Sequence, residues 1–501
     1  MGHSKIKCSF VFVIILTAGL ISWTCGESGQ EKWRGAVELD VEKLLERLDI
    51  ESEMDSENNP KISRGTFTVF EDRKTQEGRM IQLDVVVLHA TGKHKQPDPM
   101  FFLAGGPGGD ITRGWRNYGD SWIREERDIV LVSQRGTGGD NKLDCEIAAS
   151  DDNIQGYLDP LFKIETFQAC LEDLKSKFDL KQYSTFAAAD DLFELRLALG
   201  YDKINLSGSS YGTRMALIYM RQHPETVRTA TLNGVAPLSF KNPLHHAPSG
   251  HEAIQLLIAE CANDPDCNSY FPNLEEEFQI ILDRLEQEPA DVMVTHPASG
   301  ERVSVKLSKA AFAEALRMIM YSGQGSRMLP FLIHQAFLGD YEPFAQMGIE
   351  SNRGIRQSLA LAMLLCVTCA EDVSRIDPDE ITEVTGDSFL GEDRVRQQMA
   401  ICNIWPKSRL PEDFGQDVSV AVPVLILSGL YDPVTPPKFG ADAASHLPLS
   451  VHLTVPGSHG VRGPCIRDIQ QRFLDSGTVE GLDTSCTDGI QRIRFNLVGN
   501  K

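Results

Sequence analysis

Residues 203–212 read Lys-Ile-Asn-Leu-Ser-Gly-Ser-Ser-Tyr-Gly, an apolar strand signal that runs into the GxSxG sequence at 208–212. A helical pattern follows at once, over residues 214–222. A sharp turn between a strand and a helix can expose a serine hydroxyl, and it needs glycines nearby because neighbouring backbone packs against it. The five-residue motif alone is a weak signal that also fits a turn-forming serine. The strand and the helix around it favour Ser210 as a nucleophile.

Short apolar strand signals alternate with helical patterns on both sides of this turn. The expected strands are residues 65–70, 81–89, 100–104, 129–133, 204–207, 227–232, 422–427 and 451–455. A helix is expected over 187–199, and the region 239–414 is mostly helical, with helices over 253–262, 274–286, 309–321, 330–338 and 357–365. Such alternation predicts an α/β fold, a mostly parallel sheet flanked by helices, interrupted by a large helical cap.

The domain boundaries follow from this pattern. We expect a signal peptide at 1–26, an N-terminal extension at 27–62, the first part of the core at 63–238, the cap at 239–414 and the rest of the core at 415–501.

The composition is that of a globular protein, because 42% of the 501 residues are hydrophobic and 24% are charged. The formal net charge is −22, which repels nucleic-acid phosphate and anionic lipid. We therefore expect neither as a partner.

The N-terminus has the three parts of an export signal. Two lysines precede the apolar run 8–21, and small residues follow before Glu27. An uncleaved anchor is the alternative, but the run is short for a bilayer, which needs about 20 residues. Lipid attachment at Cys25 is a third possibility, and the residues before it match that signal poorly. The sequence predicts secretion or periplasmic export, with no membrane span in the mature chain.

A nucleophilic serine needs a base, and the base needs an orienting acid. In this architecture they follow in the order serine, acid, histidine, each after a late strand. Asp432 comes after the strand signal 424–427, and His459 comes after 453–455. A turn-forming Asp and a loop His are the alternatives, but both fall at strand ends in the required order. We expect Ser210, Asp432 and His459 to form a catalytic triad.

The glycine-rich loop 105–109 has two interpretations. A phosphate loop would continue with Lys and Ser or Thr, but Asp110 and Ile111 follow. The loop fits better as half of an oxyanion hole, with a backbone N–H from Gly106 and another from Tyr211, the residue after the nucleophile.

These motifs resemble those of the α/β-hydrolase peptidases related to prolyl aminopeptidase, above all the secreted tripeptidyl aminopeptidases. The resemblance is carried by Ala-Gly-Gly-Pro-Gly-Gly at 104–109, Gln-Arg-Gly-Thr-Gly at 134–138, Ala-Ala-Asp-Asp-Leu at 188–192, Gly-Ser-Ser-Tyr-Gly-Thr at 208–213, Asp-Pro-Val-Thr-Pro-Pro at 432–437 and Gly-Ser-His-Gly at 457–460. Two positions depart from the pattern: Ala104 replaces a usual His, which weakens strict proline specificity, and Ser133 replaces a usual Asp.

The resemblance implies an α/β-hydrolase fold and a serine peptidase that removes short units from peptides with a free N-terminus. It implies no metal or organic cofactor. A secreted carboxylesterase or lipase with the same triad is the alternative, and a non-catalytic binding protein is a weaker one. The sequence leaves open the residues preferred at the scissile bond, the choice between single-residue and tripeptide release, and the oligomeric state.

Nine cysteines follow the leader, and we expect eight of them in disulfides. Three pairs are neighbours in sequence: Cys145 with Cys170, Cys261 with Cys267, and Cys465 with Cys486. The resemblance implies the fourth, Cys369 with Cys402. Cys366 and Cys369 form a lone CxxC with no second ligand pair, which disfavours zinc, and Cys366 is expected as a buried free thiol.

An exopeptidase of this kind must recognise the free amine of its substrate. A carboxylate in a partly desolvated pocket binds such a cation best. Glu371 follows Cys369 in the cap, and the expected disulfide of Cys369 would hold this loop rigid. Glu371 is therefore the expected amine anchor, with Asp372 as the second candidate. Two solvated loop acids are the alternative.

Overall fold

The computed structural model describes residues 40–56, 60–147 and 149–498. The expected signal peptide, residues 1–26, lies outside the described residues, as do Cys8 and Cys25. Within the described residues, no helix is both long and apolar enough to span a bilayer.

The core is a nine-stranded sheet with the order β1-β2-β3-β5-β4-β6-β7-β10-β11. Its strands are β1 (Leu48–Met54), β2 (Pro60–Phe70), β3 (Met80–Leu88), β4 (Met100–Leu103), β5 (Ile129–Val132), β6 (Ile204–Ser209), β7 (Val227–Asn233), β10 (Val424–Gly429) and β11 (Ser450–Val455). The pairs from β1 to β5 by way of β2 and β3 are antiparallel, and those from β5 to β11 are parallel. The α/β architecture expected from the sequence is confirmed.

Alternate side chains of the parallel strands are buried on opposite faces of the sheet. On β10, Val424 and Ile426 pack into one apolar cluster, while Leu425 and Leu427 pack into another. The first cluster includes α3 (Thr185–Ala198), α4 (Tyr211–Gln222) and α15 (Pro437–His446), and the second includes α16 (Pro464–Ser476). Helices therefore cover both faces of the sheet.

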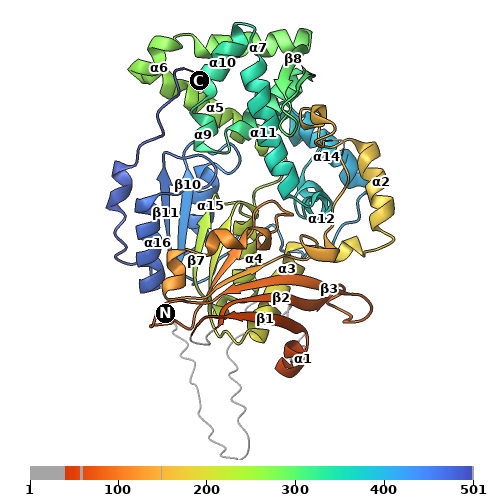
Figure 1. Cartoon of the computed structure of the whole chain (residues 1–501), viewed down its shortest axis with the longest axis vertical. Helices are drawn as coiled ribbons and strands as arrows, with labels where there is room; N and C mark the ends of the chain where they lie inside the picture. The colour runs from red at the N-terminus through yellow and green to blue at the C-terminus, as the bar shows by residue number, and fades with distance from the viewer. Residues whose placement is uncertain (1–39, 57–59, 148, 499–501) are drawn as a thin grey trace, which may run out of the picture. The chain divides into compact units, whose positions relative to one another are not determined.

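Most of the insertion between β7 and β10 has an apolar core of its own. Its elements are α5 (His246–Asn263), α6 (Pro265–Tyr270), α7 (Leu274–Gln287), β8 (Ala290–Thr295), β9 (Arg302–Leu307), α8 (Lys309–Ile319), α9 (Gly323–Ser326), α10 (Leu329–Phe337) and α11 (Glu342–Ser358). Figure 1 shows α5, α7, α10 and α11 gathered in the upper part of the view, beyond the ends of β10 and β11. The antiparallel hairpin of β8 and β9 was not expected from the sequence.

The rest of the insertion packs into the core of the sheet domain. It consists of α12 (Leu361–Glu371), α13 (Glu380–Thr385) and α14 (Asp393–Ile404). Among the described residues, the other α-helices are α1 (Val41–Leu45) and α2 (Ile164–Leu174). The expected helix over 357–365 is wrong, because the chain breaks at Leu359 and Ala360, between α11 and α12. Leu359 forms a β-bridge with Gly109, and the Ala360 N–H donates to the Gly108 carbonyl over 2.9 Å. The break thus fixes the glycine loop.

Candidate active site

Ser210 lies in the sharp turn between β6 and α4. Its φ of +56° and ψ of −127° are unusual for a residue with a side chain, and such strain is concentrated at functional sites. A Cβ on Gly212 would lie 2.2 Å from the Leu103 carbonyl oxygen, and one on Gly208 would lie 2.3 Å from the Gly212 carbonyl oxygen. Only glycine fits at either position, as the sequence motif indicates.

Asp432 and His459 meet at the ends of β10 and β11. Asp432 is 1% exposed, and its Oδ2 accepts a hydrogen bond from His459 Nδ1 over 2.8 Å. Its Oδ1 accepts from the N–H groups of Val434 (2.8 Å) and Thr435 (2.9 Å). Burial opposes ionisation of Asp432, but the interaction with His459 and these donors outweighs it, and the pKa of the carboxyl is lowered. Asp432 is thus held as a carboxylate that fixes His459.

Asn233 connects the serine turn to the histidine loop. Its carbonyl oxygen accepts from the Ser210 N–H over 3.0 Å, and its side chain exchanges two hydrogen bonds with the backbone of Val461, of 2.9 and 2.8 Å. Among the hydrogen bonds of the described residues, none joins the Ser210 hydroxyl to His459. This side-chain bridge joins Asn233 to a loop 228 residues further along the chain, so no local pattern around Asn233 indicates it.

The two residues expected to form the oxyanion hole, Gly106 and Tyr211, line one pocket together with Ser210. Tyr211 is the first residue of α4, so its N–H has no acceptor within the helix. Gly106 has a φ of +130°, which favours glycine, and the neighbouring Gly105 approaches Ser210 so closely that a Cβ there would lie 3.3 Å from the serine Cβ.

The two acids expected to bind an amine occupy different environments. Glu371 is fully buried and outside the residues that line the pocket. Its carboxylate accepts from the N–H and the hydroxyl of Thr185, both over 2.7 Å, and so caps the start of α3. Asp372 does line the pocket, but it is already paired with Arg214 over 2.7 Å.

The pocket continues from Ser210 into the cap and has many charged side chains on its walls. The charged groups are Arg214, Arg317, Arg356, Arg394, Glu314 and Asp372. They come from α4, α8, α11 and α14 and from the end of α12. Arg214 follows the serine motif closely and is the only one with a nearby sequence signal; the others are brought together by the folding of the cap.

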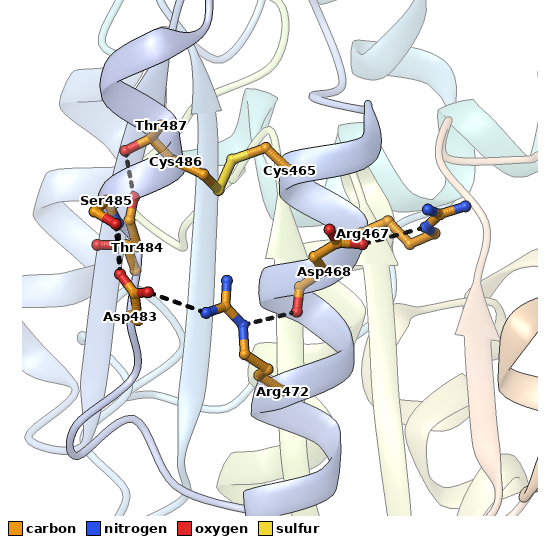
Figure 2. The surroundings of a disulfide bond; sticks show 9 residues. All are labelled: Cys465, Arg467, Asp468, Arg472, Asp483, Thr484, Ser485, Cys486 and Thr487. Atoms are coloured by element: carbon orange, nitrogen blue, oxygen red, sulfur yellow. Dashed lines mark hydrogen bonds and ion pairs between the residues drawn. A yellow bond between two sulfur atoms is a disulfide. The ribbon is translucent and has the colours of Figure 1, made fainter.

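Four disulfides join the same pairs that were expected: Cys145–Cys170, Cys261–Cys267, Cys369–Cys402 and Cys465–Cys486. Cys369 and Cys402 connect α12 to α14. Figure 2 shows Cys465, at the start of α16, bonded to Cys486, with Arg472 of α16 paired to Asp483 in the same C-terminal segment. Such a set of disulfides fits an extracytoplasmic protein.

Cys366 is the free cysteine of the described residues. It is buried, and Trp405 Nε1 donates to its Sγ over 3.4 Å. Burial raises the pKa of this thiol to about 12, so it is protonated and unreactive at neutral pH.

One group of potential metal ligands occurs among the described residues, formed by Asp417, Asp442 and His446, and it lies outside the pocket. His446 Nε2 pairs with Asp417 over 3.2 Å. Mutual pairing at the surface accounts for the cluster.

Two family models match the chain, one described as alpha/beta hydrolase fold over residues 98–275 and one described as TAP-like protein over residues 387–486. The first segment contains Ser210, and the second contains Asp432 and His459. Among curated relatives, serine protease Hip1 of Mycobacterium tuberculosis is 24% identical over 345 residues, which are 63% of this chain and 64% of Hip1. Tripeptidyl aminopeptidase of Streptomyces lividans is 28% identical over 228 residues, 42% of each chain.

Among solved structures, a proline iminopeptidase from Mycobacterium smegmatis aligns over 82% of this chain and 98% of that chain, with 15% identity and a TM-score of 0.41.

Proposed function

We propose that this chain, an α/β hydrolase with peptidases among its relatives, is a serine peptidase that cleaves peptides near their free N-terminus. The observation that carries the proposal is the strained Ser210 turn, which lines one pocket and is linked through Asn233 to the loop that carries His459, the partner of Asp432. Hip1 and the tripeptidyl aminopeptidase, both named as peptidases, favour a peptide over an ester substrate.

In the proposed mechanism, Ser210 Oγ attacks the scissile carbonyl carbon and its proton passes to His459 Nε2. Asp432 accepts the hydrogen bond from His459 Nδ1, which sets the tautomer and stabilises the imidazolium that forms. The N–H groups of Gly106 and Tyr211 stabilise the oxyanion, and each such donor contributes about 3 kcal/mol in the transition state. His459 then protonates the leaving amine, and water releases the acyl group from Ser210 by the same steps in reverse.

For the substrate amine, the proposal keeps Asp372, which is the member of the expected pair that lines the pocket. Tripeptidyl arylamides with a free and with an acetylated amine test this role. We expect acetylation to lower kcat/KM in the wild type and to matter much less in Asp372→Asn. An equal effect of acetylation in both proteins would remove Asp372 from the site.

We further propose that residues 1–26 act as an export signal and that the mature chain is secreted or periplasmic. The four disulfides support export, because such bonds persist in oxidising compartments. N-terminal sequencing of the protein recovered from the medium or periplasm tests this point, and an intact N-terminus would contradict it.

The central experiment replaces Ser210 with Ala. We expect kcat/KM for peptide arylamides to fall by about four orders of magnitude or more, because the nucleophile is lost. Ser209→Ala, at the exposed position before it, is the matched control and should retain activity. A folded Ser210→Ala protein with near wild-type turnover would overturn the assignment. Turnover of small esters without any turnover of peptides would favour a carboxylesterase.

A further inference from the structure

The pocket that contains Ser210 carries more positive than negative charge on its walls. Asp372 is paired with Arg214, and Glu314 is paired with Arg317. The pocket-lining Arg356 and Arg394 have no carboxylate at ion-pair distance among the described residues. This local excess contrasts with the chain as a whole, whose formal net charge is −22.

Among the charged side chains that line the pocket, Arg394 has the fewest polar partners. No hydrogen bond or ion pair to its side chain occurs within the described part of the chain, and its Nε is buried without a partner. The guanidinium carbon lies 4.0 Å from the centroid of the Phe162 ring, which orients the group without neutralising it. Burial, together with Arg317 and Arg356 and against the attraction of Glu314, lowers the pKa of Arg394 to about 10. It therefore remains a cation at neutral pH.

Arg356 is fixed by neutral groups only. Its guanidinium donates to the Gly156 carbonyl and, over 3.1 Å, to the Asp159 carbonyl. Burial lowers the pKa of Arg356 as well. The backbone oxygens set the direction of this side chain but leave its charge uncompensated.

The other titratable groups of the pocket do not neutralise its excess positive charge. Glu314 binds Arg317 with both carboxylate oxygens, and although burial opposes ionisation, Arg317 lowers the pKa of Glu314 to about 2. Burial, with Arg317 and Arg394, holds the pKa of His246 well below its usual value, so it is neutral. Tyr321 accepts a hydrogen bond from Arg317 over 3.1 Å. Two positive charges thus face the cavity.

A partly buried cation without an ionic partner is unfavourable, and a planar guanidinium matches a carboxylate in charge and geometry. We propose that Arg394 and Arg356 form a carboxylate-binding subsite, and that the enzyme prefers substrates with a carboxylate in the acyl part, on the N-terminal side of the scissile bond. This inference rests on the proposed peptidase function. The acyl part is chosen because Asp372, which is proposed to bind the free amine, lines the same pocket as these arginines and Ser210.

The test uses tripeptidyl p-nitroanilides with Gln at each position, in which one Gln at a time is replaced by Glu. Gln and Glu have the same shape, so their ratio of kcat/KM reports the charge. We expect a preference for Glu of at least tenfold at one position in the wild type. The ratio should fall at least tenfold in Arg394→Gln and remain unchanged in Arg396→Gln, a control in the same helix whose side chain pairs with Glu392 at the surface.

N-succinyl peptides distinguish the two sources of a carboxylate. A preference for them over N-acetyl peptides, lost in Arg394→Gln, would place the carboxylate on the N-acyl group rather than on a Glu side chain. If neither carboxylate is preferred by the wild type while neutral peptides are cleaved in a Ser210-dependent way, the subsite is refuted and the peptidase proposal stands. If no peptide is cleaved, the peptidase proposal is refuted, and the subsite proposal, which depends on it, is refuted as well. The wild-type ratio decides the matter even if Arg394→Gln does not fold.

Discussion

At the scale of single residues, Glu371 is connected through Thr185 to Tyr211, the residue after Ser210. When Glu371 is ionised, the Thr185 hydroxyl donates to it, and in the hydrogen bond of 2.9 Å between Thr185 and Tyr211 the Tyr211 hydroxyl is then the donor. The carboxylate therefore fixes, through Thr185, the residue next to Ser210. Asp372, one position further along the chain, faces the pocket instead. Two adjacent acids thus have separate roles.

Glu371 should make the stability of the protein depend on pH. Burial, which outweighs the attraction of Arg214 and the hydrogen bonds from Thr185, raises the pKa of Glu371 from 4.5 to about 7. Between these two values the folded state holds a proton that the unfolded state has lost, so the free energy of unfolding should fall by about 3 kcal/mol as the pH rises through this window. Denaturant unfolding of the wild type and Glu371→Gln from pH 4 to pH 8 measures the effect.

We expect the variant to lose most of this decline, because Gln does not titrate. Glu276→Gln, at an exposed position of α7, is the control and should keep the wild-type slope. Parallel slopes for Glu371→Gln and the wild type would mean that folding does not raise the pKa of Glu371.

The same scale shows what the sequence could predict of the site. Ser210, Asp432 and His459 stand next to strand ends in short motifs, so local pattern and chain order were enough to expect them together. Arg356 and Arg394 line one pocket only because two helices of the insertion, α11 and α14, both reach it, and no local pattern distinguishes them from surface arginines. The burial of Glu371 could not be predicted from the sequence either, because its partner Thr185 is 186 residues away along the chain.

At the scale of elements, the junction of β6 and α4 depends on backbone packed against backbone. Gly212 lies against the end of β4, at the Leu103 carbonyl, and has no space for a methyl group. Gly212→Ala should lower the free energy of unfolding by about 1–3 kcal/mol and reduce activity, since the added atom displaces the turn that holds Ser210. Chemical denaturation and peptide turnover measure the two effects.

Gly354 in α11 provides the control, since no atom lies within 4 Å of a Cβ there. Gly354→Ala should raise stability by up to about 1 kcal/mol through helix propensity. Equal effects of the two substitutions would show that the serine turn tolerates a side chain at 212.

Sequence analysis missed β1 and wrongly predicted one helix over 357–365, and each error has a physical reason. β1 is an edge strand with most side chains exposed, so it lacks the apolar alternation of the strands that pair on both sides. The residues at 357–365 have helical spacing, but contact with the glycine loop breaks the helix at Leu359 and Ala360. Tertiary contacts override local preference at both places.

At the scale of the whole molecule, the disulfides restrain the apolar cores of the cap and of the sheet domain. Cys261–Cys267 lies in the cap core, while Cys145–Cys170 and Cys369–Cys402 lie in the core of the sheet domain. The pairs span 6, 25 and 33 residues, respectively, and Cys465–Cys486 spans 21. A crosslink stabilises the folded state by restricting the unfolded chain, and longer loops give larger effects.

Replacing each pair by serines should therefore destabilise the protein in the order of loop length. Loss of Cys369–Cys402 should lower the free energy of unfolding by about 4 kcal/mol, and loss of Cys261–Cys267 by about 2 kcal/mol, when unfolding is followed in denaturant. Cys369–Cys402 also joins α12, which precedes Asp372, to α14, which carries Arg394. Its removal should raise KM for peptides at a temperature where the variant is still folded, while removal of Cys261–Cys267 leaves KM unchanged. A reversed order of stabilities would mean that native packing around each disulfide, and not the length of the loop it closes, determines what it contributes.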